Sequence, residues 1–97
     1  MLSVRLICVG KMREKFYIDA FSEYAKRLQT YCRLECVELA EQRLGDAPSQ
    51  KEIDAALGRE AAEILRNIPP DAYAVAMCVE GRQMKSEGMG DLIAARA

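Results

Sequence analysis

The chain has 97 residues, of which 51% are hydrophobic and 30% are charged, and its formal net charge is −1. Its length predicts a single domain spanning residues 1–97, and its composition excludes a disordered or membrane-embedded chain. No apolar run approaches the roughly 18 residues of a membrane span, and the N-terminus lacks a signal-peptide pattern. We therefore predict a cytoplasmic protein.

The chain contains four cysteines and no histidine. Cys8 and Cys78 lie inside apolar stretches, while Cys32 and Cys36 form one Cys-x3-Cys pair. This placement argues against a disulfide framework, and we expect no metal site because a tetrahedral zinc would need a further ligand from an apolar stretch. Without histidine there is no Ser-His or Cys-His pair, so no catalytic residue can be assigned.

The charges are distributed unevenly along the chain. Residues 1–33 carry seven basic and three acidic groups, whereas residues 34–97 carry seven basic and twelve acidic groups. A basic first third is compatible with a surface that faces nucleic acid, although a solvated helix face would show the same pattern.

The first elements predicted are a strand and a helix. Leu2 to Val9 alternates and then becomes apolar on both faces, which indicates a strand near a sheet interior. Gly10 permits a tight turn, and a helix follows with its apolar positions at helical spacing. We expect this apolar stripe to pack on the sheet; its members are Phe16, Ala20, Phe21, Tyr24 and Leu28.

A second strand and a second helix follow. Leu34 to Leu39 is interrupted by glutamates, which suggests a partly exposed edge strand. After a loop over residues 40–48, Ser49 and Glu52 have the spacing of a capping box at a helix start. The inward positions of this helix are predicted to be Ile53, Leu57, Ala61, Ile64, Leu65 and Ile68, and Pro69-Pro70 stops it.

Residues 72–79 form an uncharged run that predicts a third strand, buried on both faces. Ligand crevices in parallel sheets lie beyond the carboxyl ends of such strands, so residues 77–81 are the first place to expect a site. A third helix is predicted from Ser86 onward, with Met89, Leu92 and Ile93 on one face. The order β-α-β-α-β-α predicts an α/β fold with a mostly parallel sheet, and we expect the chain to be incomplete at its C-terminus.

Common phosphate-binding motifs are absent. Gly10 stands alone where a dinucleotide fingerprint needs three glycines, and Lys11 has neither the upstream glycine nor the Ser or Thr of a phosphate loop. From residue patterns alone the function stays open.

Several short motifs, however, occur in a characteristic order. They are Leu6-Ile7-Cys8-Val9-Gly10-Lys11, Glu14-Lys15-Phe16, Glu23-Tyr24-x-Lys26-Arg27-Leu28, Ser49-x-x-Glu52-Ile53, Gly58-Arg59-Glu60, Met77-x-x-Glu80-Gly81-Arg82 and Ser86-Glu87-Gly88. Together they resemble the RlmH-type SPOUT methyltransferases, which methylate N3 of a pseudouridine in 23S rRNA with S-adenosylmethionine.

The resemblance implies an α/β-knot fold, of which this chain would be the N-terminal portion without the knotted segment. It implies that Met77, where the family usually has leucine, and the Gly81 turn contribute to the S-adenosylmethionine site. Because most of the cofactor site would lie in the missing segment, we expect weak or absent cofactor binding and no activity from this chain alone.

The sequence is compatible with two alternative functions. The first is an rRNA methyltransferase that presents Lys11, Arg13 and Lys15 to RNA phosphates. The second is a non-catalytic α/β module for binding or dimerisation. In either case we expect the apolar edges of the first and third strands to pair with each other or to be covered in a homodimer.

Overall fold

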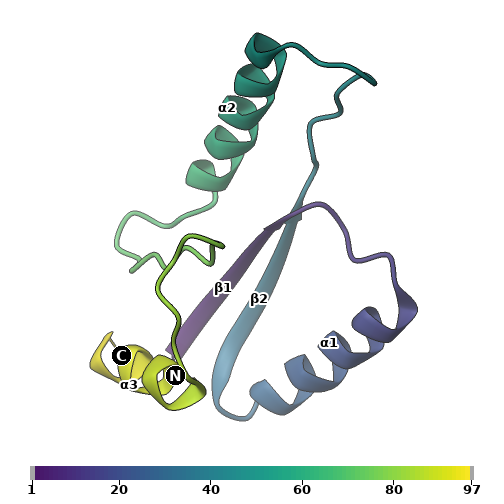
Figure 1. Cartoon of the computed structure of the whole chain (residues 1–97). Helices are drawn as coiled ribbons and strands as arrows, with labels where there is room; N and C mark the ends of the chain where they lie inside the picture. Colours follow the sequence, from purple (N-terminus) through teal and green to yellow (C-terminus); the bar gives the residue numbers. More distant parts are fainter. Residues whose placement is uncertain (1, 97) are drawn as a thin grey trace. The chain divides into compact units, whose positions relative to one another are not determined.

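The protein is an α/β chain with a parallel sheet, as predicted. The computed structural model describes residues 2–96, which form β1 (Leu2–Val9), α1 (Lys15–Leu28), β2 (Cys32–Leu39), α2 (Gln50–Arg66) and α3 (Ser86–Arg96) (Figure 1). Contacts divide the chain into two compact units, residues 1–67 and residues 68–97. The single domain stays a prediction.

The first unit is built on a two-stranded parallel ladder. β1 pairs with β2 in a register that runs from Leu2 opposite Cys32 to Val9 opposite Leu39. The backbone N–H of Gly10 then donates to the carbonyl of Leu39 at 2.7 Å. Gly10 adopts φ +92°, which glycine reaches without a Cβ clash, and the predicted turn at this position is confirmed.

Helix α2 begins at the capping box that the sequence predicts. The Glu52 N–H donates to Ser49 Oγ at 3.2 Å, and the Ser49 N–H donates to the Glu52 carboxylate at 3.3 Å. At the other end of the helix, Arg5 donates to the Asn67 carbonyl at 2.8 Å and pairs with Glu35 at 3.3 Å. The end of α2 is therefore tied to both strands of the sheet.

The two helices of the first unit bury different faces from those predicted. On α1 only Phe21 and Ala25 are half-buried, whereas Phe16 and Tyr24 are both 62% exposed. On α2 the buried residue is Ala56, at 4% exposure, with Ile53 and Ile64 half-buried as predicted. The inward placement was wrong for Phe16, Ala20, Tyr24, Leu28, Leu57, Ala61 and Leu65.

The physical reason is the width of the sheet. Two strands lie only about 5 Å apart, so a helix of about 10 Å diameter can bury one line of side chains against them and no more. The rest of each apolar stripe faces outward in the described chain. Accordingly, Cys32 and Ala56 are the only hydrophobic residues that are buried among residues 2–96.

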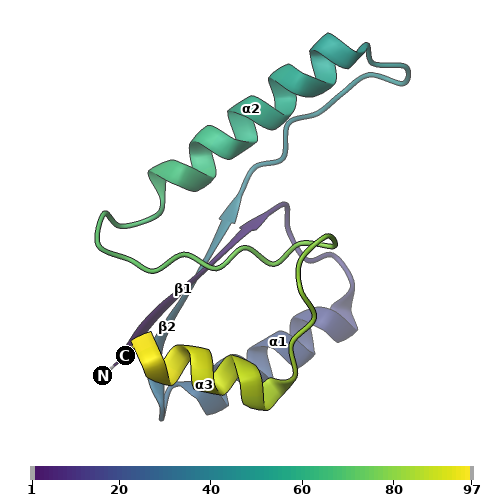
Figure 2. The ribbon, with the colours of Figure 1, turned by 60° about the vertical axis from the view of Figure 1, so that its left-hand side comes forward.

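In the second unit, the predicted third strand is not formed. Residues 73–78 have no regular secondary structure, and residues 79 and 80 form a turn, so in the described part of the chain the sheet contains β1 and β2 only (Figure 2). A strand is defined by its ladder, and the uncharged run has no pairing partner within residues 2–96. Direct pairing of the first and third strands, one of the two arrangements expected, is therefore not found among residues 2–96. The third helix does begin at Ser86; Met89 and Leu92 are half-buried, but Ile93 is 40% exposed.

The capping box gives the first testable prediction. We expect Ser49→Ala to lower the free energy of unfolding of the first unit by about 1 kcal/mol, because the Glu52 amide loses its acceptor. Denaturant unfolding followed by far-UV circular dichroism measures this change. Ser22→Ala, at an exposed position in α1, is the matched control and should change it by less than about 0.5 kcal/mol. Equal losses in both variants would contradict the capping role.

Candidate functional site

The second unit contains an open hollow of about 690 Å³ between the irregular segment and α3. Met77 and Gly81, the two residues predicted to bind a cofactor, both line it. The structure therefore brings these two positions to one surface, although no strand carries them there. The segment enters the hollow as irregular backbone, and Met77 is 79% exposed.

Gly81 closes a tight turn at the edge of this hollow. Its N–H donates to the Cys78 carbonyl at 3.1 Å. A Cβ at residue 81 would lie 3.0 Å from that same carbonyl oxygen and 3.4 Å from the Cys78 sulfur. This close approach favours glycine, because a side chain at residue 81 would require Cys78 to shift by a few tenths of an ångström and so would alter the wall of the hollow.

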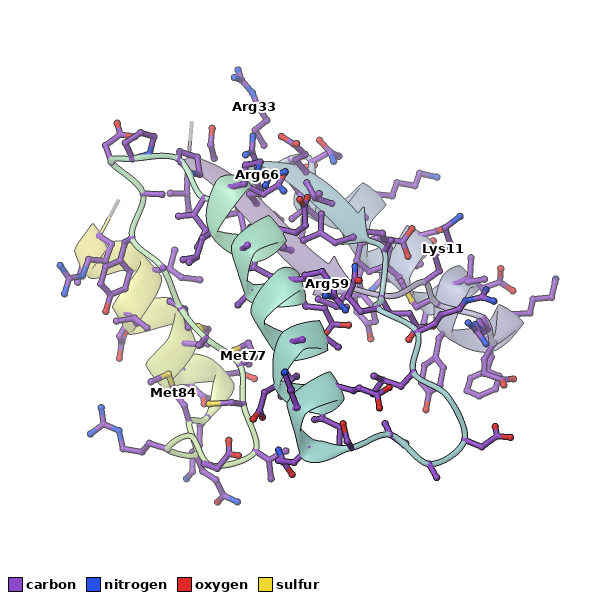
Figure 3. The ribbon with its side chains drawn as sticks, turned by 90° about the horizontal axis from the view of Figure 1, so that it is seen from above. Lys11, Arg33, Arg59, Arg66, Met77 and Met84 are labelled. Carbon is purple, nitrogen blue, oxygen red and sulfur yellow. The ribbon has the colours of Figure 1, made fainter. Side chains whose placement is uncertain are left out.

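The walls of the hollow are mainly apolar and rich in sulfur. Met84 and Met89 lie on them together with Met77, and Figure 3 labels Met77 and Met84. The charged groups among the lining residues are Arg82 and Lys85, and no carboxylate lines the hollow. Such a surface suits a ligand with a flat or apolar body and an anionic group at one end.

The three predicted RNA-binding residues lie together where the chain leaves β1 and enters α1. Arg13 pairs with Glu41 at 3.2 Å, and Lys15 pairs with Asp19 at 3.6 Å. Lys11 makes no ion pair within residues 2–96 and lies near the carboxyl end of the sheet (Figure 3). Exposed pairs of this kind are worth about 0–1 kcal/mol, so a phosphate could replace the carboxylates.

A second hollow, which was not predicted from the sequence, lies in the first unit. Three cations, Arg43, Lys51 and Arg59, are among its lining residues. The available signal was a pair of cations on either side of the Gly45–Pro48 loop. That signal was weak, because Arg43 reaches the two cations of α2, Lys51 and Arg59, only through the folding of the loop against the helix.

The cysteines are free thiols, and two of them are neighbours on the sheet. Cys8 and Cys36 lie on the same face, because Cys8 is opposite Glu38 and Cys36 is opposite Leu6. Burial raises the pKa of the Cys36 thiol, and the adjacent Cys8 and Glu38 raise that pKa further. Among the described residues, no group of three or more His, Cys, Asp or Glu side chains could hold a metal ion. No helix that the structure describes is long and apolar enough to cross a membrane.

Comparison with known proteins identifies relatives over nearly the whole chain. The family model described as "Predicted SPOUT methyltransferase" matches residues 2–97. Among curated proteins, the chain is 37% identical over 92 residues to the ribosomal RNA large subunit methyltransferase H of Streptococcus pyogenes serotype M12 (strain MGAS2096). The same identity is found with that of serotype M5 (strain Manfredo). Each match covers 95% of this chain and 58% of the relative, so the chain spans less than two thirds of their length.

The raised pKa of Cys36 predicts a shifted reactivity profile. Because only the thiolate reacts with iodoacetamide, we expect the alkylation rate of Cys36 to rise at a higher pH than that of the amino acid cysteine in solution. Cys8→Ser should move the Cys36 profile back partway, since burial remains, whereas Cys78→Ser should leave it unchanged. Peptide mass spectrometry after timed alkylation at a series of pH values measures both effects. A Cys36 profile that Cys8→Ser does not alter would contradict the coupling.

Proposed function

Because the chain belongs to the SPOUT methyltransferase family, we propose that it forms part of an S-adenosylmethionine-dependent methyltransferase of large-subunit ribosomal RNA. The observation that carries this proposal is the family match over residues 2–97. The finer assignment, to N3 of a pseudouridine in 23S rRNA, rests on the likeness of the short motifs to RlmH-type enzymes.

The hollow of the second unit is our proposed site for S-adenosylmethionine. Its volume of about 690 Å³ lies within the range of small-molecule sites, and its apolar walls suit an adenosyl group. Arg82 and Lys85 could bind the carboxylate of the methionyl part. When bound, S-adenosylmethionine supplies a methyl group on a positively charged sulfur. The task of Met77 and the Gly81 turn is therefore to hold a ligand in position rather than to move protons.

For the RNA, we propose that Lys11, Arg13 and Lys15 contact backbone phosphates. All three are exposed and lie within five consecutive residues of the chain. Phosphate contacts fix the position of a protein on RNA without reading its sequence. This surface would therefore orient the substrate and leave the choice of nucleotide to other contacts.

We also propose that the protein acts as a cytoplasmic homodimer. Leu57 is 58% exposed and Leu65 is 68% exposed on α2, and Phe16 is 62% exposed on α1. Covering such side chains with a second copy would remove about 25 cal/mol of unfavourable hydration free energy per Å² of apolar surface.

Binding of S-adenosylmethionine is tested with ¹³C-methyl-methionine labelling. We expect the signals of Met77, Met84 and Met89 to shift on titration, and the signal of Met12, outside the hollow, to serve as the internal control. Because Val79 is fully exposed and the hollow is open, half-saturation should need more than about 100 µM ligand, and the chain alone should transfer no methyl group. Absent shifts would contradict the assignment of the hollow, and a low-micromolar affinity would contradict the weak binding expected of this chain.

The RNA surface is tested by removing its three charges. We expect Lys11→Ala, Arg13→Ala and Lys15→Ala, combined in one variant, to weaken binding to a 23S rRNA fragment and to lower the salt slope by about 2. A filter-binding series at increasing salt concentration measures that slope. The control combines Lys26→Ala, Arg27→Ala and Arg66→Ala, which removes the same net charge. An equal loss in the control would show that net charge alone determines binding.

A further inference from the structure

The hollow of the first unit lies between a loop and one side of α2. It has a volume of about 340 Å³. Lys51, Ala55 and Arg59 are spaced four residues apart and so form one stripe along the helix. Arg43, Leu44 and Gly45 line it from the loop. The small side chain of Ala55 separates the two helix cations and leaves room between them.

The cations of this hollow lack anionic partners. Five ion pairs occur in the described chain, and they use Arg5, Arg13, Lys15, Arg27 and Arg66. None of Arg43, Lys51 and Arg59 is paired with a carboxylate within residues 2–96. The only acidic residue that lines the hollow is Glu52, and its carboxylate already accepts from the N–H of Ser49 at 3.3 Å and from the hydroxyl of Ser49 at 3.1 Å.

Hydrogen bonds hold one of these cations in place. The Nε of Arg59 donates to the Gln42 side-chain oxygen at 2.9 Å, and its terminal nitrogens have no hydrogen-bond acceptor within residues 2–96. The backbone N–H of Gln42 in turn donates to Glu60 at 2.8 Å, in a partly buried position. Figure 3 shows Arg59 on the side of α2 that faces the loop. The loop is thus clamped to the helix, and the Arg59 guanidinium is oriented before any ligand arrives.

We propose that this hollow binds a phosphate group, held by Arg43, Lys51 and Arg59. Guanidinium groups match phosphate oxygens with two parallel hydrogen bonds, and an ammonium adds a compact charge. The site uses side chains rather than the end of the helix, because the Glu52 amide already bonds to Ser49 Oγ. A polar hollow at the small end of the usual range suits one phosphate better than a whole nucleotide. Naming the phosphate as an RNA phosphodiester rests on the function proposed above.

The test uses the 97-residue chain with two probes, a labelled single-stranded oligouridylate and inorganic pyrophosphate. We expect Lys51→Gln and Arg59→Gln each to weaken oligouridylate binding by about five- to tenfold and to lower the salt slope by about 1. Arg66→Gln is the matched control on the same helix, since Arg66 is exposed and paired with Glu63, and it should weaken binding by less than about twofold. The side chain of Lys51 makes no hydrogen bond within residues 2–96, so its replacement tests the hollow without loosening the loop.

Each outcome decides the proposal. Losses confined to Lys51 and Arg59 support an RNA phosphate in the hollow. The NMR signal of Arg59 Nε reports binding of either probe. If it responds to pyrophosphate but not to oligouridylate, the hollow binds phosphate but the phosphate is not that of RNA. If it responds to neither probe, the proposed site is refuted. An equal loss with Arg66→Gln also overturns it, because net charge would then explain the binding. If the methionine signals fail to respond to S-adenosylmethionine while oligouridylate still binds here, the proposed cofactor site in the second unit fails and the phosphate site stands.

Discussion

The described fold depends on one parallel ladder. β1 and β2 pair along their whole length, and the bond from Gly10 to Leu39 extends the ladder into the turn that follows. This turn starts the segment that carries Lys11, Arg13 and Lys15 toward α1. The other strand delivers the chain to the loop that carries Arg43. The ladder thus sets both basic surfaces of the first unit, because each begins where one of its two strands ends.

The stability of the first unit depends mainly on backbone hydrogen bonds, because the burial of side chains contributes little to it. Only Cys32 and Ala56 are buried hydrophobic residues within residues 2–96, and both are small. Such a structure depends on hydrogen bonds at its joints: the capping box of Ser49, the Arg5 bridge to Asn67, and the clamp between Gln42 and Glu60. Each is worth about 1 kcal/mol, which is a large share of the stability of a small domain.

Local signals in the sequence predicted most of the elements. β1 was placed at its observed bounds, and the start of α2 followed from Ser49 and Glu52, because both depend on residues close in the chain. Residues 72–79 were wrongly predicted as a strand, since their apolar run cannot supply the partner that makes a strand. The inward faces of α1 and α2 were partly wrong for a related reason. Periodicity shows that a stripe is apolar, but not how wide a surface will cover it.

One of the two hollows could be predicted from the sequence, and the other could not. Met77 and Gly81 are close in sequence, so a likeness to known motifs was enough to place them at one surface. In the other hollow, Lys51 and Arg59 already lie on one side of α2, but Arg43 joins them only because Gln42 bonds to Arg59 and Glu60 and holds the loop against the helix. No rule of sequence spacing predicts that Arg43, in the loop, will lie beside Arg59, which is more than two turns into α2. A site that depends on such a clamp is recognised in the structure by its unpaired charges. Within residues 2–96, no carboxylate pairs with Arg43, Lys51 or Arg59. This distinguishes the hollow from the five exposed ion pairs, in which each cation has an acidic partner.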